Sequence, residues 1–395
     1  MNIETASLPK TADVVILGAG VMGTAIAFHL AKRKAGKIVV LDKDHVGRGG
    51  SGRSSALIRM HYTFPPEVHL ALVSLKMFQN WQDIVGAPGD FKKTGFVRIV
   101  HPNEIERLKL NVEMQRGLGA AVELVDRQQL QELAPDWKVE DVELAAYEPD
   151  SGYGDGAGVA GDFLEAARSL GVQYFPRTNA SSIAFHSGQA TGVETDRGEV
   201  SAPTVIVATG PWSRPLLKQL DYDLPIECEY HQVAILRKVA DMKVGGGACI
   251  DSVTATYFRS DAHDKFLVGD FYGTRPVDPD NFPQRASDDS LEEIIQRACR
   301  RIPKLEGAEI MRGVTGVYDV TPDSRPLLGE VPGVRGVYVC AGFSGMGFKI
   351  SPAIGLVMSE LVLDGAGKTV DISAFHPNRF AEGKPIKPQY EYVDD

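Results

Sequence analysis

The sequence of 395 residues has no long hydrophobic run, no basic cluster and no closely spaced cysteines. Because no apolar stretch reaches the roughly 18 residues of a membrane span, we expect no membrane-spanning helix. The formal net charge of −10 is spread along the chain, so no surface for nucleic acid or anionic lipid is indicated. The N-terminal residues lack the basic start and long apolar core of a secretory signal, so none is expected.

Cysteine is scarce, and its spacing argues against two kinds of site. The four cysteines, Cys228, Cys249, Cys299 and Cys340, are widely separated and form no CxxC pair. Neither a disulfide framework nor a zinc site is therefore expected, and we predict no bound metal. The same scarcity predicts a cytoplasmic protein with reduced thiols.

The clearest positive pattern is a strand, a glycine-rich turn, a helix and a second strand near the N-terminus. Residues 13–17 hold an apolar run typical of a parallel strand that is buried on both faces. Residues 21–35 have apolar positions at helical spacing and are followed by Gly36, a helix stop. Residues 38–41 then form the second strand of a βαβ unit of about 30 residues.

The turn in this unit has the G-x-G-x-x-G spacing of a dinucleotide site. Gly18 permits the tight turn, Gly20 lets the backbone approach a pyrophosphate, and Gly23 allows close helix packing. Asp42 follows the second strand, where a carboxylate can accept hydrogen bonds from the adenosine ribose. This combination predicts a bound dinucleotide, and it fits FAD and NAD nearly equally.

The rest of the pattern predicts an α/β protein with two discontinuous domains. A Rossmann-like, glutathione-reductase-like dinucleotide domain is expected from residues 1–90, 151–225 and 316–395. A second, substrate-binding α+β domain is expected from residues 91–150 and 226–315, where broken alternating runs indicate an antiparallel sheet.

The C-terminal part is predicted as a strand, a glycine turn and a helix. Ser351 is the expected N-cap of this helix, with Pro352 at its first position. The polar segment after residue 376 is expected to be a surface arm.

Five segments of the chain, taken in order, resemble one family of flavoenzymes. They are GAGVMG at 18–23, SGRSS at 51–55 leading to Arg59, VIVATGPWS at 205–213, VYDVTPDSRPLLG at 317–329 and AGFSGMGFK at 341–349. The family is the D-amino-acid oxidase superfamily of FAD-dependent oxidoreductases, within it the sarcosine oxidase and glycine oxidase branch, including the sarcosine oxidase β-subunit. This resemblance implies that the dinucleotide is FAD.

The resemblance also extends the expected FAD site beyond the three glycines and Asp42. The C-terminal turn and helix start would face the flavin and stabilise its anionic reduced form. The further residues expected to contact FAD are Ala19, Val21, Met22, Lys43, Gly50, Ser51, Arg53, Ser54, Ser55, Ala180, Ala208, Thr209, Gly210, Trp212, Gly342, Ser344, Gly345, Met346, Gly347 and Lys349.

Four residues are implied to contact the substrate. Arg59 would bind its carboxylate, for which a planar fork is suited, and Lys349 would share that carboxylate or lie beside the flavin. Tyr318 and Tyr257 would hold an amine by cation–π contact. The alternatives are a structural ion pair for Arg59, a solvated charge for Lys349 and core packing for the tyrosines.

Four positions depart from the monomeric sarcosine oxidase pattern. Gly316 stands where the flavin-linking cysteine is found, so noncovalent FAD is expected. Leu267 replaces a lysine that activates oxygen, and Phe271 replaces an active-site histidine. Met346 replaces a histidine in the glycine turn, which leaves a more apolar wall near the flavin.

The implied activity is oxidation of the C–N bond of a small amino acid or N-alkyl amino acid, sarcosine-like or glycine-like, to an imine that water hydrolyses. No base is predicted, because His61 and His231 near the matched segments are isolated histidines of a kind that is usually structural. Electrons would pass to molecular oxygen or to another acceptor. The alternatives are a dehydrogenase of the same superfamily, with a quinone or protein acceptor, and a flavin-binding subunit of a complex. A homo- or hetero-oligomer is compatible with either.

Overall fold

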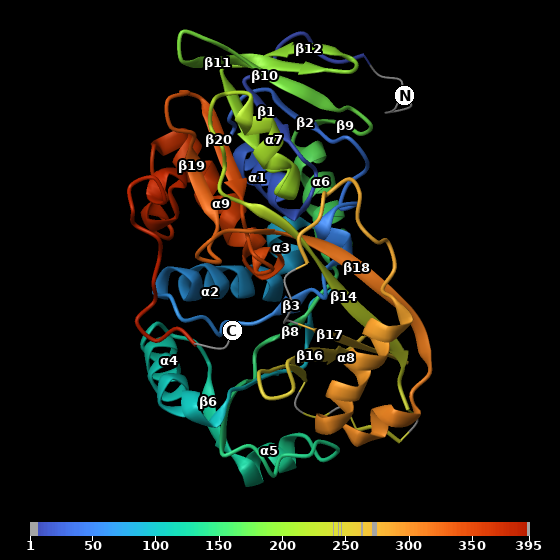
Figure 1. Ribbon diagram of the computed structural model, residues 1–395. Helices are drawn as coiled ribbons and strands as arrows, with labels where there is room; N and C mark the ends of the chain where they lie inside the picture. Colours follow the sequence, from blue (N-terminus) through green and yellow to red (C-terminus); the bar gives the residue numbers. More distant parts are fainter. Residues whose placement is uncertain are drawn as a thin grey trace.

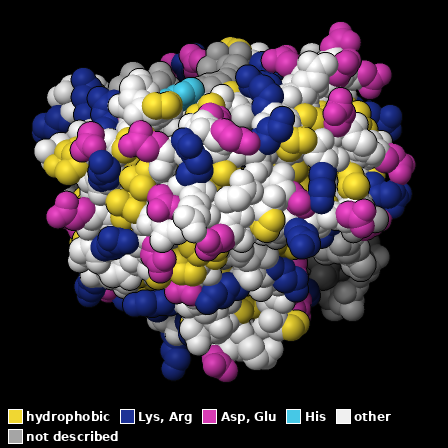
Figure 2. Space-filling view, turned by 90° about the horizontal axis from the view of Figure 1, so that it is seen from below, with side chains coloured by type: hydrophobic (Ala, Val, Ile, Leu, Met, Phe, Trp, Pro, Cys, Tyr) yellow, Lys and Arg dark blue, Asp and Glu magenta, His cyan; other side chains and the backbone are white. Residues whose placement is uncertain are grey.

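A computed structural model of the chain describes residues 7–239, 241–243, 245, 247–261, 264–270 and 275–392. Phe271, expected to replace an active-site histidine, lies outside these residues. No helix in the described ranges is both long and apolar enough to cross a membrane. On the face shown in Figure 2, acidic and basic side chains are interspersed.

The upper part of the molecule in Figure 1 is built around a six-stranded sheet with the order β19-β20-β13-β1-β2-β9. Neighbouring strands are parallel, except that β19 is antiparallel to β20. The strands are β1 (Val14–Leu17), β2 (Ile38–Leu41), β9 (Gln173–Phe175), β13 (Thr204–Val207), β19 (Leu327–Glu330) and β20 (Val337–Ala341). Each residue of β1 and β2 is buried, which explains their unbroken apolar sequence.

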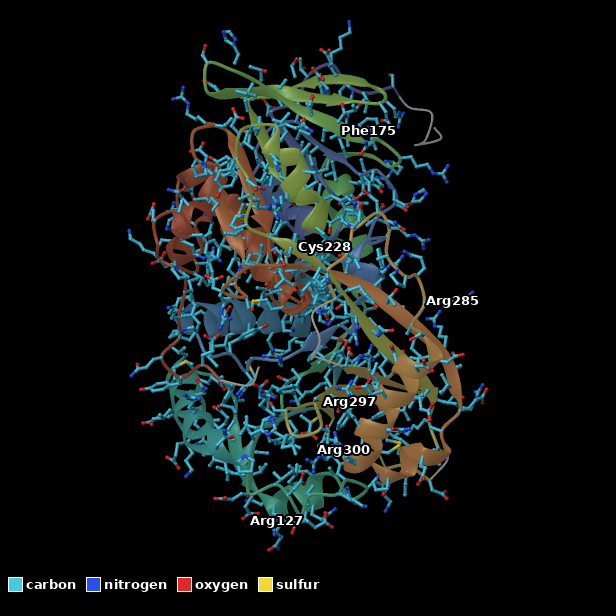
Figure 3. The ribbon with its side chains drawn as sticks, in the orientation of Figure 1. Arg127, Phe175, Cys228, Arg285, Arg297 and Arg300 are labelled. Atoms are coloured by element: carbon cyan, nitrogen blue, oxygen red, sulfur yellow. The ribbon has the colours of Figure 1, made fainter. Side chains whose placement is uncertain are left out.

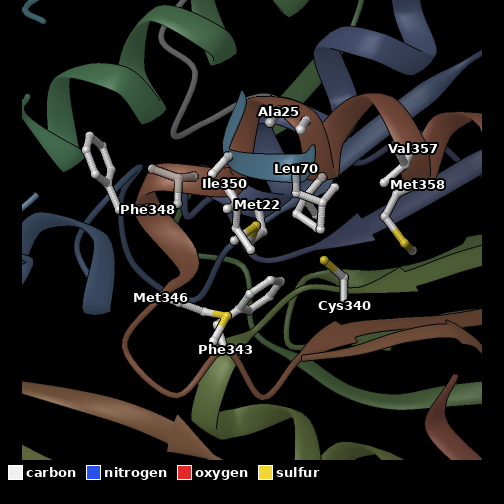
Figure 4. Packing of buried hydrophobic residues seen from close by; sticks show 14 of the residues in the cluster. Met22, Ala25, Leu70, Cys340, Phe343, Met346, Phe348, Ile350, Val357 and Met358 are labelled. Atoms are coloured by element: carbon white, nitrogen blue, oxygen red, sulfur yellow. The ribbon is translucent and has the colours of Figure 1, made fainter. Parts of the chain in front are cut away.

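Helices pack on this sheet through a continuous apolar core (Figure 4). An added Cβ on Gly355 would lie 2.6 Å from the backbone of Ala25, so the two helices that carry these residues meet closely. The helices of this part are α1 (Val21–Lys32), α2 (Pro65–Gln79), α3 (Trp81–Val85), α6 (Gly156–Ser169), α7 (Ser213–Lys218) and α9 (Gly347–Asp364).

The lower part holds an eight-stranded sheet with the order β18-β14-β17-β16-β15-β5-β7-β6, antiparallel apart from the β15–β5 pair. Its strands are β5 (Phe96–Ile99), β6 (Glu123–Asp126), β7 (Leu144–Glu148), β14 (Glu227–Arg237), β15 (Ala248–Asp251), β16 (Thr256–Ser260), β17 (Lys265–Asp270) and β18 (Ile310–Val320). The helices beside it are α4 (Ile105–Gly117), α5 (Arg127–Leu133) and α8 (Asp288–Arg301). Cys228, near the start of β14, lies where the two parts meet (Figure 3).

Two small sheets complete the fold. One consists of β10 (Ala180–His186), β11 (Gln189–Thr195) and β12 (Gly198–Ser201), and the other of β3 (Leu57–Ile58), β8 (Gly152–Tyr153) and β4 (Lys92–Lys93). The expected domain limits remain a prediction, and the limit at 316 falls inside β18, which pairs with β14 along its length up to Val320.

The predicted start of the C-terminal helix is wrong. Helix α9 begins at Gly347, so Ser351 is not its N-cap and Pro352 lies inside the helix. Because proline has no backbone N–H, the carbonyl of Phe348 loses its usual helical donor. The Ser351 hydroxyl instead donates to this carbonyl at 2.8 Å, which satisfies it and lets the helix continue.

The segment after residue 376 lies mostly on the surface, as expected, but it is anchored rather than free. The Ile386 backbone N–H donates to Asp323 at 2.9 Å, and Asn111 of α4 donates to the Tyr390 carbonyl at 2.9 Å. Tyr392 is only 6% exposed. The segment therefore runs past α2 towards α4 and is tied to both parts of the molecule (Figure 1).

Candidate functional site

The turn between β1 and α1 requires glycine at two positions, because a side chain there would collide with the backbone. Gly18 has a φ of +101°, and an added Cβ there would lie 2.4 Å from the carbonyl oxygen of Ala208. An added Cβ on Gly23 would lie 1.9 Å from the Gly18 oxygen. The turn thus brings the first amides of α1, which have no partner within the helix, to the edge of the sheet, a suitable place for phosphate.

Asp42 is held at the end of β2 with its carboxylate oriented by the backbone. Its two oxygens accept hydrogen bonds from the N–H groups of Ala19, at 2.6 Å, and Asp44, at 2.8 Å. Burial raises its pKa above the ordinary aspartate value. Because each oxygen has a second lone pair, the carboxylate can still accept a hydrogen bond from a hydroxyl on its open side.

A cavity of 730 Å³ runs along this edge, within the size range of ligand and cofactor sites. Most of the residues expected to contact FAD line it. These are Gly18, Gly20, Val21, Met22, Asp42, Lys43, Gly50, Ser51, Arg53, Ser54, Ala180, Thr209, Gly210, Trp212, Gly345 and Gly347.

The other expected FAD residues are not among those that line the cavity. Ala19 supports Asp42, and the Gly342 and Ser344 backbones donate to the Asp319 carboxylate and carbonyl. The residues outside the lining are Ala19, Gly23, Ser55, Ala208, Gly342, Ser344, Met346 and Lys349.

One wall of the cavity had no signal in the sequence. Segment 279–284, between β17 and α8, reaches across from the lower part, and Asp280 accepts hydrogen bonds from Lys43 at 2.6 Å and Trp212 at 2.8 Å. Gln284 accepts from Arg53 at 2.8 Å. These contacts join residues more than 60 positions apart, so no local pattern could reveal them.

Tyr318 lines the cavity, whereas Tyr257 supports it from behind. Ser55 donates a hydrogen bond to Tyr257, which donates to Tyr318, and burial raises the pKa of both tyrosines. The ring of His231 lies 4.0 Å from that of Tyr318, and burial lowers the histidine pKa to about 4. An added Cβ on Gly345 would lie 2.8 Å from the Tyr318 ring, so this glycine leaves room for the tyrosine.

Arg59 and Lys349 lie near each other and next to this end of the cavity, although neither is among the residues that line it. The Arg59 guanidinium lies 4.6 Å over the ring of Tyr62 and donates to the His61 carbonyl, while its Nε has no hydrogen-bond partner among the described residues. Lys349 is 7% exposed, and its Nζ lies 3.4 Å from the Gly345 carbonyl. Burial and, next, Arg59 lower the pKa of Lys349 well below its ordinary value. This pair has donors and charge to spare for a carboxylate.

Sequence reasoning missed one acidic residue near this pair. Glu67, in the first turn of α2, is fully buried, and its Oε1 lies 2.9 Å from the Nε of Arg325. Burial raises the Glu67 pKa to about 7, although Arg325 and Arg59 oppose this shift. It is the type of group that offsets part of a buried positive charge.

The positions that depart from the sarcosine oxidase pattern have defined surroundings. Gly316 of β18 lies beside Arg53, whose Cβ would be 3.2 Å from a Cβ added to the glycine. Leu267 lies in an apolar cluster with Leu57 and Tyr257. Met346 packs into the core of the upper part.

Cys340 is the single cysteine among the described residues that line the cavity. Burial and, next, Asp319 raise its pKa, which keeps it as a thiol. A thiol is a poor nucleophile, so Cys340 is not set up to attach a cofactor covalently.

Known proteins are similar to this chain in sequence and in fold. The family model described as DAO, FAD dependent oxidoreductase, matches residues 13–361. The chain is 26% identical to the mitochondrial pyruvate dehydrogenase phosphatase regulatory subunit of Mus musculus, over 92% of this chain and 42% of that protein. It is 24% identical to mitochondrial dimethylglycine dehydrogenase of Rattus norvegicus, over 96% of this chain and 46% of that protein. It thus spans less than half the length of these two curated relatives.

Glycine oxidase of Geobacillus kaustophilus is similar over nearly its whole length, at 25% identity over 89% of this chain and 92% of that protein. Its solved structure has a TM-score of 0.82, at 25% identity, and covers 94% of this chain and 99% of that chain. L-proline dehydrogenase from P. horikoshii has a TM-score of 0.89, at 26% identity, and covers 96% of this chain and 100% of that chain.

These matches confirm the predicted fold class and the resemblance to amino acid oxidases and dehydrogenases. They also distinguish between the two dinucleotides that the glycine fingerprint left open, because the matching family uses FAD. The chain belongs to the DAO family of FAD-dependent oxidoreductases.

Proposed function

We propose that this FAD-dependent oxidoreductase oxidises the C–N bond of a small amino acid or N-alkyl amino acid, sarcosine-like or glycine-like, to an imine. The observation that carries this proposal is that Arg59 and Lys349 lie near each other, and that Lys349 reaches the carbonyl of Gly345, which lines the cavity beside Tyr318. Such a pair suits a substrate with a carboxylate next to its reacting carbon. FAD, when bound, supplies the acceptor for a hydride equivalent.

The side chains of this chain would bind and orient the substrate. Arg59 and Lys349 would hold the carboxylate, and the ring of Tyr318 would pack against the amine and orient it. His231, with a pKa of about 4, and Tyr318, with a raised pKa, are both poor bases at neutral pH. The amine must therefore arrive in its neutral form, and activity should rise with pH through the pKa of the substrate amine. Water then hydrolyses the imine to a carbonyl compound and an amine, or ammonia where the nitrogen carries no alkyl group.

The relatives support a substrate of this class through their names, which are glycine oxidase, dimethylglycine dehydrogenase and L-proline dehydrogenase. Identification of the carbonyl and amine products from purified FAD-loaded protein tests the proposal. Formation of the carbonyl compound with an equal amount of amine or ammonia is expected, and turnover that releases neither would contradict C–N cleavage.

The apolar surroundings of Leu267 favour a second candidate, a dehydrogenase with a quinone or protein acceptor. Stopped-flow reoxidation separates the two, because a dehydrogenase should reoxidise slowly in air and rapidly with a dye. Rapid reoxidation in air would favour the oxidase.

The match to a regulatory subunit favours a third candidate, a flavin-binding subunit of a complex. The native size of the protein, measured with and without co-purified partners, tests it. Full activity of the separate chain would contradict it.

A further inference from the structure

We propose that Tyr392 is a positioning residue for the carboxylate site, acting on Arg59 through His61. The inference rests on the proposed function, because it takes Arg59 as the carboxylate-binding group. It goes further by giving a task to the segment that was expected to be a surface arm.

Tyr392 contacts His61 in two ways. Its hydroxyl lies 2.8 Å from the His61 Nε2, and the two rings stack with centroids 5.9 Å apart and planes 8° from parallel. The guanidinium carbon of Arg98 lies over the Tyr392 ring, 5.0 Å from its centroid. Both rings are almost fully buried, so the pair has one defined geometry rather than a mobile surface contact.

His61 in turn holds Arg59. The His61 carbonyl accepts a hydrogen bond from the Arg59 guanidinium, and the next residue, Tyr62, lies under that guanidinium at 4.6 Å. The same loop is fixed from behind, where the Met60 N–H donates to Glu148 at 2.8 Å and Gln115 donates to the Tyr62 carbonyl at 2.9 Å. Tyr392 adds a further contact to the same loop, through the ring of His61.

Glu391 forms a second link from the same segment. Its carboxylate lies 2.9 Å from an amino group of Arg325, which also pairs with the buried Glu67. Glu67 acts electrostatically on both Arg59 and Lys349. Residues 391 and 392 therefore reach both the loop that carries Arg59 and the acid that offsets its charge.

The experiment compares Tyr392→Phe with Tyr390→Phe in FAD-loaded protein. Both changes remove one tyrosine hydroxyl, but at Tyr390 the recorded hydrogen bond uses the backbone carbonyl, which the change leaves intact. The probe is acetate, the smallest carboxylate, titrated against the flavin absorbance, with acetamide as its uncharged match. Arg59→Met is measured alongside.

Tyr392→Phe should raise the acetate dissociation constant about threefold to tenfold, the effect expected when one hydrogen bond is lost. Acetamide binding and FAD affinity should stay as in the wild type, whereas the melting temperature should fall because the buried His61 Nε2 loses its partner. Tyr390→Phe should change none of these properties. Glu391→Gln should weaken acetate in the same direction, which provides a second test if Tyr392→Phe folds poorly.

Two outcomes would overturn the inference, and they differ from failure of the proposed function. If Arg59→Met loses acetate binding while Tyr392→Phe and Glu391→Gln bind it normally, the positioning role is wrong. If acetamide weakens as much as acetate, the effect is general packing and the role is wrong as well. If Arg59→Met itself binds acetate normally, the carboxylate role of Arg59 in the proposed function fails, and the inference fails with it.

Discussion

At the scale of single residues, Arg59 is the main proposed contact with the substrate. Its planar guanidinium is held by Tyr62 and the His61 carbonyl, while its Nε has no hydrogen-bond partner within the described part of the chain. Arg59→Met should raise the apparent substrate constant by about tenfold to a hundredfold, the usual worth of a charge-assisted hydrogen bond, and leave the flavin spectrum unchanged. Arg59→Lys keeps the charge but loses the planar fork of donors, so its apparent substrate constant should lie between those of the wild type and Arg59→Met. Saturation kinetics with both variants measure this, and an unchanged constant in Arg59→Met would remove Arg59 from the site.

The lowered pKa of Lys349 leads to a prediction about how stability depends on pH. Its pKa is lowered well below 10.5 in the folded protein, whereas the unfolded chain keeps that ordinary value. Between the two pKa values the unfolded chain binds more protons, so Lys349 makes stability rise with pH towards 10.5. Lys349→Met should therefore be more stable than the wild type at about pH 7, and this advantage should shrink at about pH 10. Urea unfolding at saturating FAD measures it, and an advantage of equal size at both pH values would contradict the lowered pKa.

At the scale of elements, segment 279–284 carries a prediction about cofactor retention. Asp280 joins this segment to Lys43 and Trp212 across the cavity, although its side chain is 66% exposed. Asp280→Ala should speed FAD dissociation about threefold to tenfold, since one surface ion pair and one hydrogen bond are lost. The difference should shrink at high salt, which screens the ion pair.

Flavin fluorescence after dilution measures this rate, because released FAD gains fluorescence. Asp289→Asn, in the first turn of α8 and away from the cavity lining, is the matched control. Equal dissociation rates in wild type and Asp280→Ala would show that the segment does not retain FAD.

The sequence was informative for elements whose structure depends on neighbouring residues. The β1 strand, the glycine turn and α1 follow from an apolar run, three glycines and helical spacing, and Asp42 follows from its distance along the chain. The start of α9 was missed because proline after serine resembles a helix start. Here the Ser351 hydroxyl instead donates to the Phe348 carbonyl, which Pro352 cannot do, and the helix continues. Segment 279–284 and Tyr392 were missed because their contacts are made between residues distant in sequence.

At the scale of the whole molecule, the cavity runs along the six-stranded sheet, where we expect the dinucleotide, and the eight-stranded sheet brings Tyr318 of β18 to its wall. The family match shows that the dinucleotide is FAD. We expect the substrate to be set by side chains from the residue after β3 and from β16, β18 and α9, and one sequence does not specify how these side chains meet.

The central claim, that an amino acid is oxidised at its C–N bond, is tested most directly by anaerobic bleaching of the flavin. FAD-loaded protein is mixed without oxygen with a panel of N-methyl, D- and L-amino acids, and the absorbance at about 450 nm is followed. The account predicts that at least one small amino acid bleaches the flavin, and that its amide, which lacks the carboxylate, does so much more slowly. Bleaching by no member of the panel, or equally by acid and amide, would contradict it.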